Sequence, residues 1–320
     1  MSQIANVAPS MRRVMQTGSV RVWQLTRNEL FKLRKRRMVW TLLAADLFII
    51  GAAWLALMYS ASQSADGFQP GHLLGGPDAL AYMIGQPMTW GRRGGEFVAA
   101  ALGGLVFGGE FSTGAIRLVL SRGVNRTRYL VAKYLALAIV CAALALAGML
   151  LAALLCNFLV VIHQPAPTLL NLDGRTLGML VGMSIGMLEN YLFCLLLGAA
   201  LGILSRSAAF GIVASFGWLI GEDIAARIIV AVGGAAHTAP GNLIVSLLFT
   251  PNLNAFYAHS LPSFLSAALN QLDGVIACGA LGAMCSAPAG PVHAVLVSLV
   301  WALMLGGTSV YLFVRRDVQQ

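Results

Sequence analysis

The sequence predicts an all-α polytopic membrane protein with six transmembrane helices and both termini in the cytoplasm. Of its 320 residues, 58% are hydrophobic and only 10% are charged, and the mean hydropathy is +0.78. Charged residues make up about 25% of a typical soluble domain, so this composition indicates a membrane protein. The apolar residues form long continuous runs, which predict membrane-spanning helices rather than the alternating pattern of a membrane β-barrel.

The distribution of basic residues predicts the orientation. All but four of the 21 Lys and Arg residues fall in segments assigned to the inner side, and such a bias places those segments in the cytoplasm. The four exceptions are Arg92, Arg93, Arg175 and Arg227. This placement explains the net charge of +9 without a nucleic-acid partner. The expected location is the cytoplasmic (inner) membrane.

Two segments precede the first span. Residues 1–18 are polar and small, which predicts a disordered lead. Residues 19–37 interleave apolar side chains such as Trp23 and Phe31 with Arg and Lys. Amphipathic helices that lie in the membrane interface have this pattern. We therefore expect an interfacial elbow helix that contacts membrane lipid and leads into the first span.

The transmembrane domain is expected over residues 38–320, with spans at about residues 38–60, 97–109, 130–162, 176–204, 208–222 and 292–314. The second span is short for a full crossing. It therefore extends into flanking residues, or begins in a re-entrant piece before Glu96. Residues 61–95 are rich in Gly, Pro and Asp, which predicts a loop, with a short helix that dips into the interface as an alternative for residues 79–84. Residues 233–291 contain several Pro and Gly residues and predict short helices at the outer interface.

A charged interval, residues 110–133, separates the second and third predicted spans. Read as one helix, it places Glu110, Gly114 and Arg117 on a shared face, because their spacing is i, i+4 and i+7. Gly123 interrupts this pattern, and Asn125 is placed to cap the following helix. The five basic residues of the interval predict a cytoplasmic loop over residues 110–129.

No catalytic or metal-binding motif is found in the sequence. It contains no His-Glu-x-x-His, no Gly-x-Ser-x-Gly and no phosphate-binding loop, because none of its lysines follows a glycine. We therefore expect no catalytic residue, no metal, no cofactor bound by this chain and no nucleotide hydrolysis. The cysteines lack metal-ligand spacing and are expected to pack in the apolar interior, with a Cys278–Cys285 disulfide as the alternative for that pair. The histidines fall on the predicted outer side and are expected to be interfacial.

Acidic residues inside the predicted spans are candidates for a functional site, because a charge is costly in hydrocarbon. Glu189 and Asn190 lie near the middle of the fourth span. A polar site within the membrane and a hydrogen-bonded contact between helices explain Glu189 equally well. Asp46 is expected to pair with a basic or polar neighbour, and the Glu222/Asp223 pair to mark the outer end of the fifth span. An intramembrane enzyme or a secondary transporter using Glu189 and the Glu222/Asp223 pair is the alternative function.

Three segments of the chain resemble ABC-2 type ABC-transporter permeases. The first is Glu110-x3-Gly114-x2-Arg117, followed by Leu120-Ser121-Arg122-x-Val124-x-Arg126 and by Tyr129-x3-Lys133. The second is the run from Asn28 to Arg37, which is similar to the elbow helix of that family. The third is Phe313-Val-Arg315-Arg316-Asp317-Val318, which is similar to its C-terminal ending. The chain departs from the family pattern at Ala115, where Thr is usual, and at Gly123, where Pro is usual.

The resemblance implies a non-catalytic permease subunit that works as a dimer, with a second copy or a homologue, and with cytoplasmic ABC ATPase subunits that bind ATP and Mg. It also implies export of a hydrophobic or amphipathic substrate such as a drug, an antibiotic or a lipid. In such permeases the first cytoplasmic loop forms a coupling helix that docks into the ATPase. The resemblance therefore assigns ATPase coupling to Glu110, Gly114, Arg117, Arg122 and Arg126. The candidates for the substrate pathway are Glu189 and Asn190.

Overall fold

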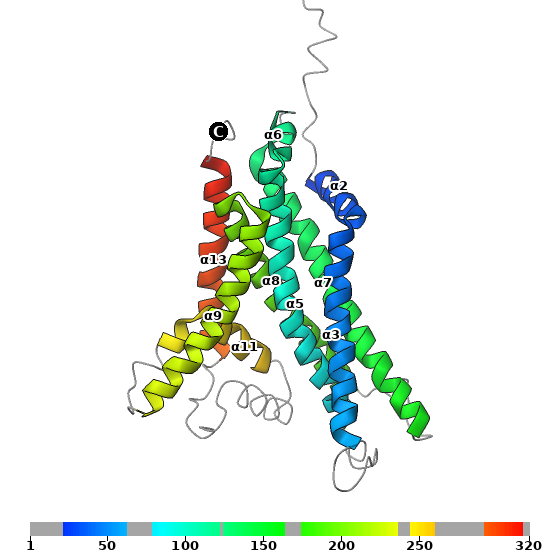
Figure 1. The fold of residues 1–320 in the computed structure, drawn as a ribbon. Helices are drawn as coiled ribbons and strands as arrows, with labels where there is room; N and C mark the ends of the chain where they lie inside the picture. The colour runs from blue at the N-terminus through cyan, green and yellow to red at the C-terminus, as the bar shows by residue number, and fades with distance from the viewer. Residues whose placement is uncertain are drawn as a thin grey trace, which may run out of the picture.

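A computed structural model of the chain describes residues 22–62, 79–121, 124–163, 174–235, 244–259 and 291–315. These residues are helical without a strand, as the sequence predicts. The helices are α2 (Val22–Lys35), α3 (Arg37–Ser62), α5 (Ala79–Ser112), α6 (Ala115–Leu120), α7 (Arg126–His163), α8 (Gly174–Ser205), α9 (Ala208–Ala235), α11 (Phe249–His259) and α13 (Pro291–Arg315). Figure 1 shows their arrangement as one bundle. The predicted disordered lead and the Cys278–Cys285 pair lie outside the described residues.

Five of the described helices are long and apolar enough to cross a membrane, namely α3, α7, α8, α9 and α13. They correspond to the first, third, fourth, fifth and sixth predicted spans, which confirms the all-helical prediction for the described residues, with several candidate spans. Helix α9 continues past Glu222 and Asp223 to Ala235, so these acids do not mark its end. The count of six spans and the cytoplasmic placement of both termini stay predictions.

The second predicted span differs most from the structure. Residues 97–109 lie in the C-terminal half of α5, a single helix of 34 residues that includes Pro87. The predicted loop is therefore wrong for residues 85–95, and the short helix expected at residues 79–84 is the start of this long one. The extension of the second predicted span into flanking residues is confirmed, and no re-entrant break precedes Glu96. Residues 63–78 lie outside the described part. Packing against neighbouring helices outweighs the low helix propensity of the Gly and Pro residues in this segment.

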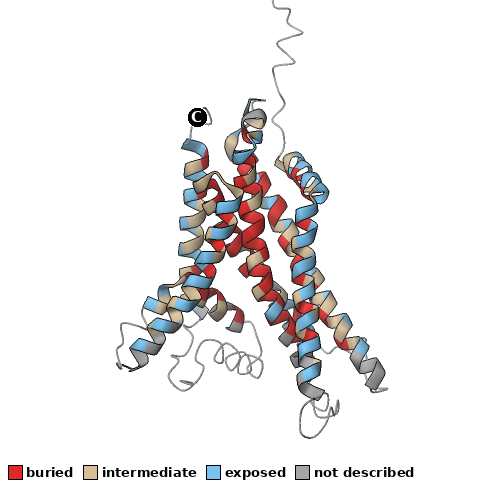
Figure 2. Cartoon of the chain, in the orientation of Figure 1, coloured by how far each residue is buried: buried red, intermediate tan, exposed pale blue. Residues whose placement is uncertain are grey.

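Glycines set the distance between α5 and its neighbours α8 and α9. A Cβ atom added at Gly198 of α8 would overlap the Ala100 carbonyl oxygen of α5, and one at Gly103 would overlap the Leu195 carbonyl oxygen. A Cβ atom at Gly211 of α9 would press against the backbones of both α5 and α8. Small residues allow this close approach of helices in membranes. Figure 2 shows the buried residues concentrated along α5 and α8, where these contacts lie.

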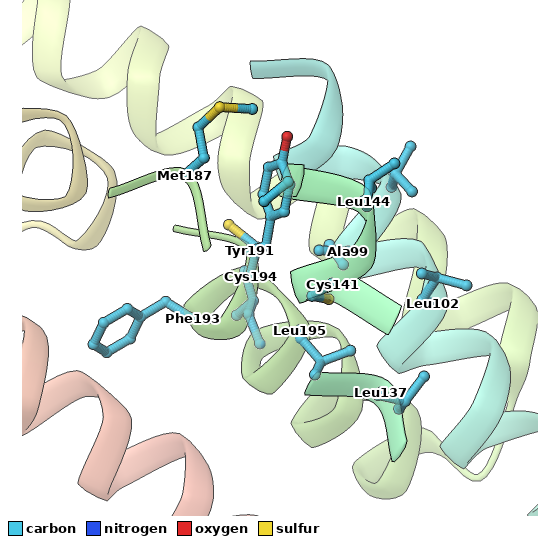
Figure 3. Packing of buried hydrophobic residues seen from close by; sticks show 14 of the residues in the cluster. Ala99, Leu102, Leu137, Cys141, Leu144, Met187, Tyr191, Phe193, Cys194 and Leu195 are labelled. Carbon is cyan, nitrogen blue, oxygen red and sulfur yellow. The ribbon is translucent and has the colours of Figure 1, made fainter. Parts of the chain in front are cut away.

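Three of the cysteines pack in the core that surrounds this contact. Cys141, Cys156 and Cys194 are buried thiols that form no disulfide. Figure 3 shows Cys141 and Cys194 among apolar side chains, close to Leu137 and Leu195. The predicted packing role is confirmed for these three residues.

The two ends of the bundle differ in shape. Figure 1 shows the helices close together near α6 and the end of α13, and spread apart at the opposite end, where the short helix α11 lies. At the closed end α8 and α9 are joined by a tight turn at residues 205–207. Arg206 adopts the left-handed conformation there, with a φ of 57°, and the Ser205 hydroxyl donates to the Ser207 carbonyl at 3.3 Å.

Helix α2 packs against α7 and α3 at the closed end of the bundle. Its buried side consists of Thr26, Glu29 and Leu33, which recur at the three- and four-residue spacing of one helix face. The structure thus confirms a helix within the segment predicted at residues 19–37. The position of this helix in the membrane interface stays a prediction.

Candidate functional site

The charged interval after α5 is broken by a left-handed glycine. Helix α5 ends at Ser112, and Gly114 has a φ of +68°. The Gly114 amide donates to the Phe111 carbonyl at 3.2 Å, a bond typical of helix ends that are terminated by glycine. The chain then restarts as α6. The prediction that Glu110, Gly114 and Arg117 share one helical face is therefore wrong, because Glu110 and Arg117 belong to different helices.

Glu110 points into the bundle rather than toward a surface. Its side chain is 6% exposed and lies 2.5 Å from the Lys133 ammonium. The Tyr129 hydroxyl also donates to the Glu110 carboxylate, at 2.7 Å. Both partners come from α7, so the last turn of α5 is tied to the first turns of α7 on the other side of the loop.

Lys133 completes this buried inner cluster, which we define as Glu110, Tyr129 and Lys133. Its ammonium donates to the Val106 carbonyl at 3.0 Å and lies 5.0 Å from the centre of the Phe107 ring. A buried charge is tolerated when it has an opposite charge and further hydrogen-bond partners. The inner cluster meets both conditions and fixes α5 against α7.

The start of α7 is fixed by a cap and by a contact with the last helix. The Asn125 side chain accepts hydrogen bonds from the amides of Thr127 at 2.9 Å and Arg128 at 3.4 Å, which confirms the predicted cap. Arg126 donates to the Val314 carbonyl near the end of α13 at 2.9 Å. The loop is thereby joined to a helix that is 188 residues away in the chain.

An aromatic contact strengthens the same junction. Phe313 of α13 is buried, and its ring centre lies 6.0 Å from that of Phe111 and 6.4 Å from that of Tyr129. The end of α13 therefore packs on both sides of the loop. Sequence reasoning placed this C-terminal motif in the resemblance but did not predict its contact with the loop.

Residues predicted for coupling occupy different positions in the structure. The Glu110 side chain is buried between helices, Gly114 lies in the turn that separates α5 from α6, and Arg126 contacts α13. The Arg117 side chain and the whole of Arg122 lie outside the described residues. Surface-exposed positions that the structure does describe within residues 110–129 are Ser112, Thr113, Ala115, Ser121, Asn125, Thr127 and Arg128.

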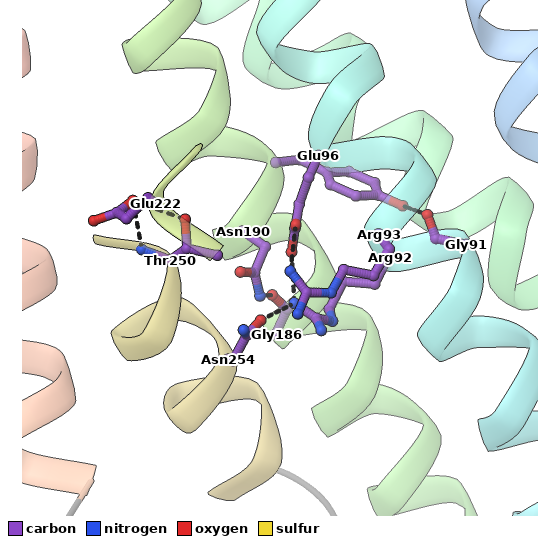
Figure 4. A network of polar contacts seen from close by, with 10 residues as sticks. Gly91, Arg92, Arg93, Glu96, Gly186, Asn190, Glu222, Thr250 and Asn254 are labelled. Atoms are coloured by element: carbon purple, nitrogen blue, oxygen red, sulfur yellow. Dashed lines mark hydrogen bonds and ion pairs between the residues drawn. The ribbon is translucent and has the colours of Figure 1, made fainter. Parts of the chain in front are cut away.

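A second buried ion pair lies toward the other end of α5 and was missed by the sequence analysis. Arg92 is 1% exposed, and its Nη1 atom lies 2.5 Å from the Glu96 carboxylate, one helical turn away. The same atom donates to Asn254 of α11 at 2.9 Å, and the guanidinium lies 4.6 Å from the centre of the Tyr257 ring. Arg93 lies 3.5 Å from Glu96. Figure 4 shows this outer network.

The signal for the outer network was present in the sequence. Arg92 and Glu96 have the i, i+4 spacing of a helical ion pair. The sequence analysis instead assigned Arg92 and Arg93 to an outer loop, because Gly and Pro are frequent around them. The structure corrects that assignment and places both arginines within α5.

Asn190 and Glu189 are adjacent on α8 but have different surroundings. Asn190 is fully buried, and its amide donates to the Gly186 carbonyl of its own helix at 2.9 Å, as Figure 4 shows. Its Oδ1 atom accepts no hydrogen bond from the described residues. Glu189 is half-buried and has no hydrogen bond or ion pair with any described residue. Of the two, only Asn190 has a buried polar atom without a hydrogen-bond partner among the described residues.

Two of the other acids in the predicted spans, Glu222 and Asp46, contact polar groups in the structure. Glu222 of α9 accepts hydrogen bonds from the amides of Phe249 at 2.5 Å and Thr250 at 3.1 Å. These amides belong to the first turn of α11, where helical amides lack partners of their own. Asp46 is fully buried beside Tyr191, whose hydroxyl lies 3.5 Å from its Oδ2 atom. Its Oδ1 atom has no hydrogen-bond partner among the described residues. This agrees with the polar neighbour expected for Asp46.

A bundle of long apolar helices with charged pairs buried between them is typical of membrane transport proteins. Among the described residues, no three His, Cys, Asp or Glu side chains could together hold a metal ion. The model of a family described as ABC-2 family transporter protein matches residues 25–221. The chain belongs to this family. A search of curated proteins found no match.

Proposed function

We propose that this chain is the membrane-spanning permease subunit of an ATP-binding cassette exporter in the cytoplasmic membrane. A separate cytoplasmic ATPase would bind ATP and Mg and hydrolyse the nucleotide, and a second permease would complete a dimer. The substrate is hydrophobic or amphipathic. The family match over residues 25–221 carries this proposal, because it includes α2, the loop and most of the bundle.

The loop between α5 and α7 is the proposed coupling element. Arg117 and Arg122 would contact the ATPase from this loop, and Gly114 would permit the change of chain direction that presents them. Glu110 and Arg126 would connect the loop to the transmembrane helices rather than contact the ATPase. Their contacts to Lys133 and to the Val314 carbonyl join the loop to α7 and α13, so a pull on the loop would move three helices together.

Glu189 and Asn190 are the proposed substrate-pathway residues. The support is their position near the middle of α8, the buried Oδ1 atom of Asn190 without a partner, and the carboxylate of Glu189, which forms no hydrogen bond or ion pair with a described residue. Glu222 does not support the alternative of a secondary transporter, because both of its carboxylate oxygens already hold the start of α11.

The proposal is tested by purifying the tagged chain after co-expression with a candidate ATPase that carries nucleotide-binding motifs. We expect the ATPase to be retained, and the double variant R117E/R122E to reduce its retention at least tenfold. The variant R175E carries an acidic substitution at the other end of the molecule, near the start of α8. It should leave retention unchanged.

Retention that is equal in the wild type and in R117E/R122E would contradict coupling through this loop. Substrate export is tested separately with a panel of amphipathic antibiotics. Loss of the ATPase and the variant E189Q should both increase susceptibility to the same compounds. Unchanged susceptibility in E189Q would indicate that Glu189 has a structural role rather than a role in the substrate pathway.

A further inference from the structure

Helices α2 and α3 meet in a tight corner at the closed end of the bundle. Helix α2 ends at Lys35 and α3 begins at Arg37. The Arg36 amide donates to the Leu33 carbonyl, and the Val39 amide donates to the Arg36 carbonyl, both at 3.1 Å. Figure 1 shows α2 at an angle to α3 across this turn. The corner therefore presents its side chains from a fixed backbone.

The exposed charges on this corner are all positive. Arg27, Arg34, Lys35 and Arg37 are exposed, and none of them forms an ion pair with a described residue. The only acid in residues 22–41 is Glu29, which is buried and lies 2.6 Å from the Lys32 ammonium.

Neighbouring helices do not supply the missing negative charge. The only acid in α3 is Asp46, which is fully buried. Helix α7 contains no Asp or Glu. Because α2 packs against these two helices, the positive charge of the corner is not balanced by a described acid of either neighbour.

Large apolar side chains are exposed between these cations. Trp23 is 62% exposed, Phe31 is 58% exposed and Trp40 is 56% exposed. The Trp40 indole nitrogen donates to the Arg34 carbonyl at 2.8 Å, and the Lys35 ammonium lies 4.4 Å from the centre of the Phe31 ring. Aromatic rings beside basic side chains suit the boundary between lipid headgroups and acyl chains. A surface made for a small soluble anion would not need exposed rings.

The corner is also continuous with an apolar surface that could face lipid. Helix α3 is long and apolar enough to span a membrane. Its exposed residues include Trp40, Phe48 and Leu55. The cationic side chains therefore lie at the end of a candidate span, at the depth where phospholipid headgroups would begin.

From this juxtaposition we infer that the α2–α3 corner is a binding surface for anionic phospholipids of the inner leaflet. Arg27, Arg34, Lys35 and Arg37 contact the negatively charged headgroups, and Trp23, Phe31 and Trp40 insert between them. The inference does not depend on the proposed transport function, because it uses only charge, exposure and the geometry of the corner.

The test is a native mass spectrometry titration of the full-length chain with phosphatidylglycerol and, separately, with phosphatidylcholine. The wild type should bind phosphatidylglycerol more tightly. One Lys or Arg near an anionic surface contributes roughly a fivefold gain in binding. We therefore expect the triple variant R34Q/K35Q/R37Q to raise the apparent Kd for phosphatidylglycerol at least tenfold and to leave that for phosphatidylcholine unchanged.

The matched control is R128Q/R315Q, which removes positive charge from two other exposed positions at the same end of the bundle. It should change the apparent Kd for phosphatidylglycerol less than twofold. If the triple variant fails to fold, the single variants R34Q, K35Q and R37Q carry the same test, each with an expected increase of two- to fivefold.

Three results would overturn the inference. The first is equal binding of phosphatidylglycerol by the wild type and the triple variant. The second is an equal loss in the control, which would show that net charge alone is responsible. The third is displacement of the lipid by millimolar glycerol 3-phosphate, which would identify a site for soluble anions. Selective loss of ATPase retention in the triple variant, with lipid binding intact, would identify a protein-docking surface instead.

Discussion

The inner cluster and the outer network both bury an ion pair, but they connect the helices differently. The inner pair, Glu110–Lys133, joins α5 to α7, so the charge attraction itself crosses between two helices. The outer pair, Arg92–Glu96, lies within α5. Arg92 is linked to α11 by contacts with uncharged groups, a hydrogen bond to the Asn254 amide and the Tyr257 ring 4.6 Å from its guanidinium.

This difference predicts different stiffness at the two ends. Separating α5 from α7 would leave charges buried without partners, which is strongly unfavourable. Moving α11 away from α5 would break the hydrogen bond to Asn254 and the contact with the Tyr257 ring, while Arg92 keeps its carboxylate partner. We infer that the helices at the closed end move as one unit. At the opposite end, α11 can change its contacts with α5 at a lower cost in free energy.

The largest expected effect is at the inner cluster. The variant K133M leaves Glu110 buried and uncompensated, so we expect the free energy of unfolding to fall by about 3–5 kcal/mol. Denaturant unfolding in detergent measures this change. The control R128M alters an exposed residue one turn earlier on α7 and should have an effect below about 0.5 kcal/mol.

The double variant E110Q/K133M distinguishes the effect of the charge pair from that of side-chain packing. Removing both charges should restore a large part of the stability lost in K133M, because no unpaired charge remains. A loss in the double variant equal to that in K133M would show that packing of the lysine stem, rather than the charge pair, holds α5 against α7.

The outer ion pair should show a smaller effect. In R92M the Glu96 carboxylate retains Arg93 at 3.5 Å, so the expected loss is about 3 kcal/mol, at the low end for a broken buried pair. The control R93M removes a side chain that is partly exposed and should cost less. A greater loss in R93M than in R92M would reverse the assignment of the main partner of Glu96.

The features predicted from sequence are those encoded locally. Five of the six spans predicted from the apolar runs correspond to candidate spans among the described helices. The alternation of basic and apolar residues predicted α2, and the position of Asn125 before a helical run predicted its role as a cap. Each of these signals lies within a few residues of the feature that it predicts.

The features that were missed depend on contacts between distant segments. Residues 85–95 have the composition of a loop, and they are helical because α8 and α3 pack against their glycines. Glu110 was expected on the same face as Arg117. Its inward direction depends on Lys133 and Tyr129, and the glycine conformation at Gly114 separates it from Arg117.

The link between the outer network and α11 gives a smaller and more local prediction. The variant N254L keeps the size of the side chain but removes the acceptor for Arg92, and we expect a loss of about 1.5 kcal/mol, typical of a hydrogen bond to a charged group. Hydrogen exchange should increase in α11 and remain unchanged at residues 105–112 and 126–133. Increased exchange at both ends would contradict the separate behaviour of the inner and outer contacts.

The smallest expected effect is at the break between α5 and α6. Gly114 has a φ of +68°, and a residue with a Cβ atom in the left-handed conformation costs about 1 kcal/mol. The variant G114A should therefore lower stability by about that amount, whereas G114N should cost only a few tenths, because Asn tolerates this conformation. Because a Cβ atom at this position would meet no atom within 4 Å, any difference between the two variants reports backbone conformation rather than crowding. Equal losses in G114A and G114N would show that the loop does not require the left-handed conformation, and the change of direction between Glu110 and Arg117 would then need another cause.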